Sequence, residues 1–584
     1  MISTVPPALI FVFGAFLVPL LSGNTRRNYL LLLPVIGLIN LFSTPVGTHW
    51  VVNFLDFDLV FGKIDKLSLV WGYIFHIIAF LSVLYAIHVK NNLEQWSTFF
   101  YAGSALGVVF SGDLISLFCF WEMMTIGSAC LILARRTKKS YEAAFRYTLV
   151  HVAGGLILLA GIVMHITATG SVEFKHLGLD SPGAWFIFIG FGVNCAWPIL
   201  HAWLPDAYPE ATFSGSVVLS TFTTKTAVYV LARSFAGADP LILIGATMTV
   251  FPIFYALVEN DLRKVLSYSL IDQVGFMVVG IGVGTELALN GVAAHAFCHI
   301  LYKALLFMSM GSVLHMTGKI KATELGGLYK SMPLTSIFCM VGAASIAGLP
   351  FFNGFISKTM IIDAAATEHY SLAWLALMFA SASAIIIPGI KVPYLAFFGK
   401  DSSITTSEPP HNMVLAMGIT AFLCVFVGII PSTLYSILPF PVTYEPYTIA
   451  HLVTKFQLLL FAAVACMYLM KSGIYPEEKK NIYLDADWFY RKGGKLFVML
   501  ARNPVEVIDK YFGEIYMQII SKPGLKLAQV VWKFFDVAIV DGLVNLTARV
   551  ARDCGEHIRH YQTGHVRNYA LMMVIGFVLI LFFL

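Results

Sequence analysis

Three ionisable side chains recur at four-residue spacing in the apolar segment 291–318: His295, His299 and Lys303. Four residues make about one helical turn, so a helix would carry all three on one face. An ionisable group at bilayer depth costs roughly 3 kcal/mol on insertion scales. A row of three on one face therefore predicts a hydrated path along which charge moves.

The composition indicates that a membrane surrounds this segment. The chain has 584 residues, of which 58% are apolar and only 12% charged, whereas about 25% of the residues in a soluble protein are charged. Its apolar stretches are about 20 residues long and mostly end in Gly, Pro or charge, which is typical of helices rather than barrel strands. The net charge of +5 is small and gives no reason to expect a nucleic-acid partner.

We expect an all-α integral membrane protein with about sixteen spans. The first span has no basic residues before it and is interpreted as a retained helix, and the alternating residues 47–62 predict a small extramembrane hairpin. Seven basic loops fall on one side if the spans alternate, which places that side in the cytoplasm and the N-terminus outside. The predicted spans are 6–22, 28–45, 66–88, 97–112, 113–134, 142–167, 184–202, 212–235, 238–257, 265–284, 287–316, 333–366, 371–399, 411–431, 447–471 and 568–584.

No motif in the chain supplies conventional enzymatic chemistry. The eight cysteines include no CxxC pair and no His/Cys ligand spacing, so they are interpreted as structural thiols, with no metal and no cofactor expected. A Walker motif, a GxGxxG fingerprint and a Ser/His/Asp arrangement are also missing from the sequence. No catalytic residue is therefore assigned, and the energy for transport must come from an ion gradient or from partner subunits.

Two spans are interrupted by helix-breaking residues. Pro198 and Pro205 interrupt the first, and Gly348, Pro350 and Gly354 interrupt the second. A broken helix at membrane depth frees backbone groups that must face a cavity or protein, and paired breaks in two halves are typical of inverted-repeat transporters. The alternative is that Pro and Gly are simply commoner in membrane helices.

The segment 484–567 is amphipathic and too polar to cross a membrane. We expect a long lateral helix there, which Pro523 and Gly524 could kink, followed by an anchoring span at 568–584. Such a helix resembles a strut laid along neighbouring membrane subunits. The alternative is an ordinary interfacial amphipathic helix.

Further ionisable residues lie inside predicted spans. Glu122 is interpreted as a proton site or as half of a packing ion pair, because a buried carboxylate must be protonated or paired. Lys225 is mid-span, where a desolvated lysine can exchange protons. Lys391 follows Pro388 and Gly389, although it could instead snorkel to the cytoplasmic boundary.

Secondary candidates flank the two breaks. Lys358 follows the second break, and Asp272 is either a relay group or a simple partner for a lysine. His201 and Asp206 lie beside the first break and are expected to shape its cavity. The number of these groups, rather than any one of them, indicates ion transport.

Six motifs resemble the antiporter-like subunits of respiratory complex I, membrane-bound hydrogenases and Mrp-type cation/proton antiporters. They are FWEMMT, WPILHAWLPDAYPEA, STFTTKTAVY, DLRKVLSYSLIDQVGF, HAFCHILYKALLFMSMGSV and AGLPFFNGFISK, and the resemblance covers roughly residues 66–400. In the tail, Asp536–Asn545 and Tyr561–Phe577 resemble the end of the largest such subunit in complex I. There, a lateral helix precedes a last membrane span.

The resemblance implies two inverted five-helix repeats, each forming a half-channel. Glu122 would modulate a buried lysine, Lys225 would be a relay lysine, His295, His299 and Lys303 would form the central relay, and Lys391 would be the exit lysine. The implied organisation is N-terminal helices with a hairpin (1–92), repeats at 93–237 and 238–400, C-terminal helices (401–483), the lateral helix (484–567) and the anchor (568–584).

One position departs from the family pattern. Members usually have a lysine in the span before the first break, in a GxxxKxxxxPxHxWLP pattern, where this sequence has Asn194. An amide cannot carry a proton. Either Lys225 takes over the pairing with Glu122, or the first half-channel is altered or non-pumping. The first option is preferred, because Glu122 would otherwise only cost free energy.

The sequence therefore predicts a subunit that translocates protons within a multisubunit, complex I-like membrane complex. We expect it in the inner cell membrane, with the lateral helix on the cytoplasmic face against other membrane subunits. One alternative is an Mrp-type sodium/proton antiporter subunit. Another is a non-pumping structural subunit, which Asn194 favours and the intact row in 291–318 argues against.

Overall fold

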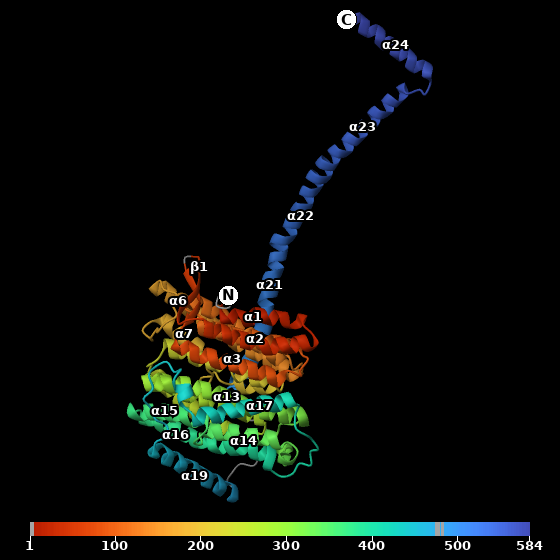
Figure 1. Ribbon diagram of the computed structural model, residues 1–584. Coiled ribbons are helices and arrows are strands. Elements are labelled where there is room, and N and C mark those ends of the chain that lie inside the picture. The colour runs from red at the N-terminus through yellow and green to blue at the C-terminus, as the bar shows by residue number, and fades with distance from the viewer. Residues whose placement is uncertain (1–4, 56, 474–478, 480–483) are drawn as a thin grey trace. The chain divides into compact units, whose positions relative to one another are not determined.

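The computed structural model describes residues 5–55, 57–473, 479 and 484–584, and it is predominantly helical (Figure 1). Ten helices within these residues are long and apolar enough to cross a membrane, so the chain is an integral, multi-pass membrane protein. They are α3 (Lys66–Ala86), α5 (Leu114–Leu133), α6 (Lys138–Thr169), α11 (Pro240–Val258), α12 (Leu262–Val283), α13 (Glu286–Thr317), α16 with its continuation (Ser371–Phe398), α17 (His411–Ile429), α19 (Ile449–Lys471) and α24 (Val566–Phe583).

The other expected spans coincide with shorter, divided or more polar helices. The span expected at 333–366, for example, is divided into two helices. The remaining elements before residue 487 are α1 (Pro7–Leu17), η2 (Val18–Leu20), α2 (Gly23–Ser43), α4 (Asn92–Phe110), α7 (Pro182–Asn194), α8 (Trp203–Ala207), η3 (Tyr208–Glu210), α9 (Gly215–Leu219), α10 (Thr223–Ser234), η4 (Ala322–Glu324), η5 (Leu328–Lys330), α14 (Pro333–Ala347), α15 (Asn353–Thr367), η6 (Ile385–Lys391), η7 (Tyr394–Phe398) and α18 (Ser432–Tyr435).

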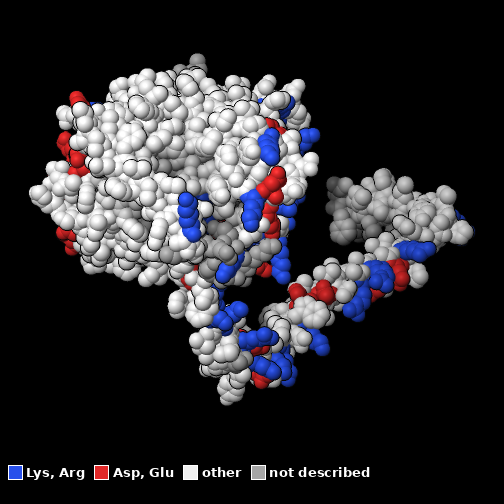
Figure 2. All heavy atoms as spheres, turned by 90° about the horizontal axis from the view of Figure 1, so that it is seen from below, with Lys and Arg blue, Asp and Glu red and all other residues white. Residues whose placement is uncertain are grey.

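The chain divides into two compact units, Met1–Asp487 and Trp488–Leu584. In the first unit, α1 to α3 lie at one edge of the bundle and α19 at the opposite edge (Figure 1). The helices α12 and α13 form the centre of this unit. In their most apolar stretches of 18 residues, all of the residues of α12 and 94% of those of α13 are buried. Large areas of the first unit's surface carry no charged side chain in Figure 2. The costly polar groups of α12 and α13 are therefore shielded by protein.

One two-stranded antiparallel sheet is described, formed by β1 (Gly47–Phe54) and β2 (Phe57–Ile64). It lies where the alternating sequence predicts a hairpin. The hairpin packs onto the start of α5, because the amide of Val60 donates to Oδ2 of Asp113 at 2.7 Å. Asp113 also caps α5 by accepting from the amide of Ser116.

The helices α6 and α13 have matching dimensions. Each has 32 residues and ends at a glycine in the left-handed conformation with φ of 68°. The start of α13 lies 148 positions after that of α6 (286 against 138). The same offset relates two isolated backbone bridges, Asp113 to Glu173 and Asp261 to Lys321. The segments α5–α6 and α12–α13 therefore share one local architecture.

The two predicted breaks also share a geometry. After α7, Ala196 and Ile199 have positive φ angles of 60° and 73°, and after α14, Gly348 and Phe351 have φ angles of 68° and 73°. Pro198 precedes Ile199, and Pro350 precedes Phe351. The amide of Trp197 donates to the carbonyl of Gly192, and the amide of Leu349 donates to that of Ala344, in each case five positions earlier. This is the 6→1 bond that ends many helices. Both spans stop by the same backbone turn.

The second unit consists of α20 (Asp487–Leu500), α21 (Glu506–Tyr516), α22 (Lys522–Val531), α23 (Asp541–Tyr561) and the span α24. The π-type segments η8 (Ala501–Val505), η9 (Met517–Ser521) and η10 (Trp532–Val540) join the first four, and α21 to α23 run on as one curved rod in Figure 1. This is the helical segment that the sequence predicts at 484–567.

The π-type segment η9 lies in a run of apolar residues spaced by four. Ile508, Phe512, Tyr516 and Ile520 are all exposed and lie four residues apart. In an α-helix each step of four would rotate the next side chain by about 40° around the axis. A π-type turn has more residues per turn and reverses that drift. The segment η9, which follows Tyr516 and contains Ile520, therefore offsets part of the drift that accumulates from Ile508 to Tyr516 within α21.

Candidate functional site

The predicted row of ionisable residues lies at the centre of the bundle. His295, His299 and Lys303 project from α13 and are fully buried. The rings of His295 and His299 are nearly parallel, with an interplanar angle of 19° and centroids 5.9 Å apart. One face of α13 therefore brings two imidazoles and an ammonium into one line, as the four-residue spacing predicts.

The helix α12 supplies polar partners to this row. Nζ of Lys303 donates to Oγ of Ser269 at 2.5 Å. The carboxylate of Asp272 accepts from Nε2 of Gln273 at 2.8 Å and interacts electrostatically with Lys303 and with Lys358. Asp272 is thus the buried counter-charge that two lysines share.

The helix α15 continues the row beyond His295. Nδ1 of His295 lies 2.9 Å from Oγ of Ser357, and the next residue is Lys358. Nζ of Lys358 donates at 2.5 Å to the carbonyl of Ile346, which the break after α14 leaves without a helical partner. Ser357 and Lys358 therefore extend the central row, which consists of His295, His299 and Lys303, as far as the second break.

Several polar atoms of the row are buried and have no protein partner among the described residues. They are both ring nitrogens of His299, Nε2 of His295 and Oδ1 of Asp272. Buried polar atoms are normally bonded to protein or to ordered water. The row thus has the donors and acceptors that a chain of internal water molecules would bridge.

Lys225 extends the row toward the N-terminal half. It is fully buried on α10, where its Nζ donates to the carbonyl of Ser220 at 2.7 Å and to Oγ1 of Thr224 at 3.3 Å. It also interacts electrostatically with Lys303 and with His299. Lys225 therefore lies within electrostatic range of the central row.

The expected pairing of Glu122 with Lys225 is not present. No ion pair involves Glu122 among the described residues, and its Oε1 is buried without a hydrogen bond. The carboxylate instead faces Gly155 of α6, where an added Cβ would collide with Oε1. The preferred pairing of Lys225 with Glu122 is therefore not formed: Lys225 donates to Ser220, just after α9, and to Thr224 of its own helix.

The offset of 148 positions identifies what α6 carries in place of the central row. The positions that correspond to His295, His299 and Lys303 are Tyr147, His151 and Gly155 (for example, 303 against 155). The rings of Tyr147 and His151 stack with centroids 3.9 Å apart and are buried. The first half thus has a tyrosine and a histidine at the two histidine positions of the second half, and a glycine at its lysine position.

Asn194 is the second position at which the first half lacks a lysine. Its side chain is fully buried at the end of α7, and neither amide atom has a hydrogen-bond partner among the residues described. An amide buried without partners costs roughly 1–3 kcal/mol. Asn194 therefore gives α7 a polar but uncharged position beside the break.

His201 and Asp206 contact different partners. Nε2 of His201 lies 3.0 Å from Oδ1 of Asp485. Asp206 forms a two-pronged ion pair with Arg146, whose Nε and Nη2 donate to its carboxylate at 2.7 and 3.0 Å. The two residues therefore fix the segment after the first break to different elements, α6 and the stretch before α20.

Lys391 is not placed in the central row. Its Nζ donates to three backbone carbonyls at the end of α11, those of Ala256, Leu257 and Glu259, at 3.2, 2.6 and 3.0 Å. A cation at a helix C-terminus compensates both the free carbonyls and the helix dipole. The contacts of Lys391 are those of a helix cap, close to the boundary position that the sequence leaves open as an alternative.

Sequence reasoning missed one buried lysine, Lys455 in α19, which is 7% exposed. It lies near the start of an apolar span, where a snorkelling lysine is common. The criterion that identified Lys225, a lysine within an apolar span, would have found it.

The comparisons with known proteins test the family resemblance. Residues 111–386 match the family model described as NADH:quinone oxidoreductase/Mrp antiporter, transmembrane region. The match covers 276 of the 584 residues, just under half of the chain. The family resemblance that the motifs predict is therefore confirmed.

Relatives and solved structures extend the antiporter-like similarity beyond that region. The chain is 28% identical over 595 residues to NAD(P)H-quinone oxidoreductase subunit 5, chloroplastic, of Chara vulgaris, which covers 92% of this chain and 87% of the relative. It is 30% identical to a Na(+)/H(+) antiporter subunit of Alkalihalophilus pseudofirmus over 52% of this chain and 65% of the relative. The membrane-bound sulfane sulfur reductase, an archaeal respiratory membrane complex, contains a chain of the same fold with 22% identity and a TM-score of 0.67, covering 80% of this chain and 99% of that chain.

Proposed function

We propose that this chain is an ion-translocating, antiporter-like subunit of a multisubunit membrane complex, and that it moves protons. The observation that carries the proposal is the buried line of ionisable groups from Lys225 through Lys303, His299 and His295 to Lys358. Ionisable groups inside a membrane bundle are costly and mark ion pathways. The relatives of this chain include subunits of both quinone oxidoreductases and Na(+)/H(+) antiporters.

Protons would pass along the line by exchange between side chains and internal water. A neutral imidazole of His295 or His299 accepts a proton on one ring nitrogen and releases one from the other. Asp272, which interacts with both Lys303 and Lys358, stabilises whichever lysine is charged. Movement of one charge changes the electrostatic energy of the next lysine, so an event in a neighbouring subunit can drive the transfer.

We also propose that the chain contains two inverted repeats, with α5–α7 corresponding to α12–α14. The equal lengths of α6 and α13, the common offset of 148 positions and the matching turns at both breaks support this correspondence. The first repeat has Gly155 and Asn194 at lysine positions, so we assign the principal ion path to the second repeat, with Lys225 as the contribution of the first. Glu122 then serves only the first.

The proposed setting is the inner cell membrane, with the N-terminus outside and the segment 484–567 on the cytoplasmic face. The basic loops of the sequence support this orientation. Acidic side chains gather at the left edge of the first unit in Figure 2, whereas basic side chains are more frequent toward its right. The many exposed apolar residues of α20–α23 support contact with other membrane subunits or with lipid.

Two other functions have specific support. A sodium/proton antiporter role fits the similarity to the Na(+)/H(+) antiporter subunit of Alkalihalophilus pseudofirmus. A non-pumping structural subunit fits Gly155 and Asn194, but it leaves the free energy of burying Lys303, Lys358 and Asp272 unexplained. The second-repeat row therefore favours transport over a structural role.

The test is ion flux in proteoliposomes that contain the intact complex. We expect Lys303→Met to lower proton flux at least tenfold without loss of the subunit from the complex, because methionine preserves the size of the side chain but carries no proton. Parallel recording with a sodium-sensitive dye separates proton from sodium transport. Unchanged flux of both ions in Lys303→Met would contradict the proposal and favour the structural role.

A further inference from the structure

A cavity of about 190 Å³ lies between α15, α16 and α19, next to the second break. Its lining is apolar except for a group of ionisable and hydroxyl side chains. These are Lys358, Thr359, Asp363, Ser381, His451, Thr454 and Lys455. The cavity therefore begins at Lys358, the residue that extends the central row to the second break.

Lys455 is the buried ionisable group for which the central row gives no role. Its Nζ donates to Oγ of Ser381 at 2.9 Å, and the described residues give it no second acceptor. An ammonium has three donors, and Lys455 lines a cavity large enough for several water molecules. A lysine placed only for packing would not need this arrangement.

Lys455 and Lys358 converge on the same residue of the break. A Cβ added to Gly348 would lie 3.1 Å from Nζ of Lys455 and 3.7 Å from Cδ of Lys358. The two lysines also interact electrostatically. Gly348 thus leaves room for two cationic side chains to face one cavity.

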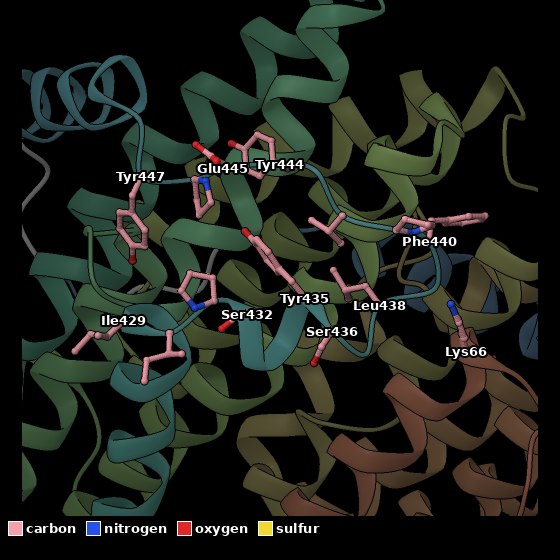
Figure 3. A pocket seen from close by; sticks show the side chains of 15 residues that line it. Lys66, Ile429, Ser432, Tyr435, Ser436, Leu438, Phe440, Tyr444, Glu445 and Tyr447 are labelled. Atoms are coloured by element: carbon pink, nitrogen blue, oxygen red, sulfur yellow. The ribbon is translucent and has the colours of Figure 1, made fainter.

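The other end of the cavity leads toward the surface of the bundle. Asp363 and His451 are partly exposed and lie near the end of α15 and the start of α19. Tyr444 is close enough to Asp363 for an electrostatic interaction, and it also lines a broad recess of about 740 Å³. Figure 3 shows this recess with Tyr444 and Glu445 side by side and Lys66 at one edge. Polar side chains therefore continue from Lys358 to an open surface.

We propose that this cavity is the route by which Lys358 exchanges protons with the surface near residues 444–451, and that Lys455 is the carrier between them. The proposal rests on the proposed function. The Lys358 ammonium passes one proton, directly or through water, to the neutral amine of Lys455. The Lys455 ammonium then passes that proton to the Asp363 carboxylate or to the His451 imidazole, which releases it to the recess.

The charged groups around Lys455 are those that the mechanism uses. The helix α15 contributes Lys358 and Asp363, and α19 itself contributes His451. The helix α16 (Ser371–Ala384) has no ionisable residue, and neither does the break 348–352. The segment η6, which also packs against α19, contains Lys391, whose Nζ is bonded to the end of α11. A change at Lys455 therefore acts on a small and known set of charges.

The experiment measures proton flux in proteoliposomes of the intact complex as a function of pH, with Lys455→Met and Lys455→His. Lys471→Met is the control, because Lys471 is an exposed lysine at the other end of the same helix. We expect at least a fivefold loss of flux in Lys455→Met and none in Lys471→Met. We expect Lys455→His to restore part of the flux and to move its pH dependence toward lower pH, because an imidazole titrates below an ammonium.

Wild-type flux and pH profile in Lys455→Met would overturn the route. If Lys303→Met then still abolishes flux, only the route through Lys455 fails, whereas unchanged flux in both variants removes the proposed function as well. Should Lys455→Met fail to assemble, Asp363→Asn together with Lys455→His tests the same path. An unaltered pH profile in both of these variants would equally overturn it.

Discussion

Oδ1 of Asp485 lies 3.0 Å from Nε2 of His201, although 284 positions separate the two residues in the sequence. The hydroxyl of Tyr268 donates to the other carboxylate oxygen at 2.7 Å. The side chains of His201 and Asp485 are 4% and 8% exposed. The last residues before α20 are therefore fastened to the first break and to α12.

The first prediction concerns the strength of this fastening. Burial raises the pKa of Asp485. The hydrogen bond and charge of His201 and the hydrogen bond from the hydroxyl of Tyr268 lower it by more, so the pKa lies below its usual value. A carboxyl with a lowered pKa stabilises the folded state above its unfolded pKa, near 3.8, and loses that contribution as the pH falls through the folded pKa. The Asp485 carboxylate is therefore expected to be ionised at neutral pH and to accept there from the hydroxyl of Tyr268 and the amide of Ala486.

We expect Asp485→Asn to loosen this contact at neutral pH, since it removes the carboxylate but keeps the shape of the side chain. Hydrogen exchange of the amides at 485–487 should then be faster by about fivefold, as a loss of about 1 kcal/mol implies. Asp509→Asn is the matched control, because Asp509 is exposed on α21. Equal exchange in wild type and Asp485→Asn would show that the carboxylate does not hold the segment.

The sequence predicted the central row and the breaks, because both depend on local spacing. His295, His299 and Lys303 must share a face of any helix that contains them. A proline favours a helix end or a kink, although Pro34 and Pro252 lie inside α2 and α11. The contacts of Lys391 and Asp485 could not be predicted, because their partners are far away in the sequence. Lys391 bonds carbonyls more than 130 positions earlier, and such pairings arise only from the packing of the whole bundle.

The second prediction compares the two repeats. Glu122 has no cationic partner in the described residues and faces Gly155, whereas Lys303 is bonded to Ser269 and interacts with Asp272. We expect Glu122→Gln to retain at least half of the wild-type proton flux, against the tenfold loss expected for Lys303→Met. Flux in proteoliposomes of the intact complex measures both. A loss in Glu122→Gln as large as that in Lys303→Met would return the first repeat to the main path.

The third prediction separates a cap from an exit site at Lys391. Its three bonds to the end of α11 imply that Lys391→Met leaves buried carbonyls unpaired and destabilises the subunit by about 2 kcal/mol or more. We expect a lower melting temperature of the detergent-solubilised complex. Lys391→Arg keeps donors and charge and should restore part of that stability. If Lys391→Met instead melts like wild type but conducts no protons, Lys391 is an exit lysine and the cap is incidental.

The last prediction distinguishes the two roles that the sequence allows for Asp272. It is 2% exposed and interacts electrostatically with Lys358 and Lys303. Removing one partner of a buried charged set is strongly destabilising, by about 3 kcal/mol or more, because the other charges are left uncompensated. We therefore expect Asp272→Asn to lower the stability of the complex sharply, as measured by thermal unfolding.

The double variant Asp272→Asn, Lys358→Met decides between a counter-charge and a relay group. If Asp272 only balances the lysines, removing Lys358 as well should recover much of the lost stability, and the two changes should be clearly non-additive in a double-mutant cycle. We expect that recovery of stability together with a proton flux that stays low, because Lys358 connects the central row to the cavity beside Lys455. Flux recovered along with stability would show that neither Asp272 nor Lys358 carries protons.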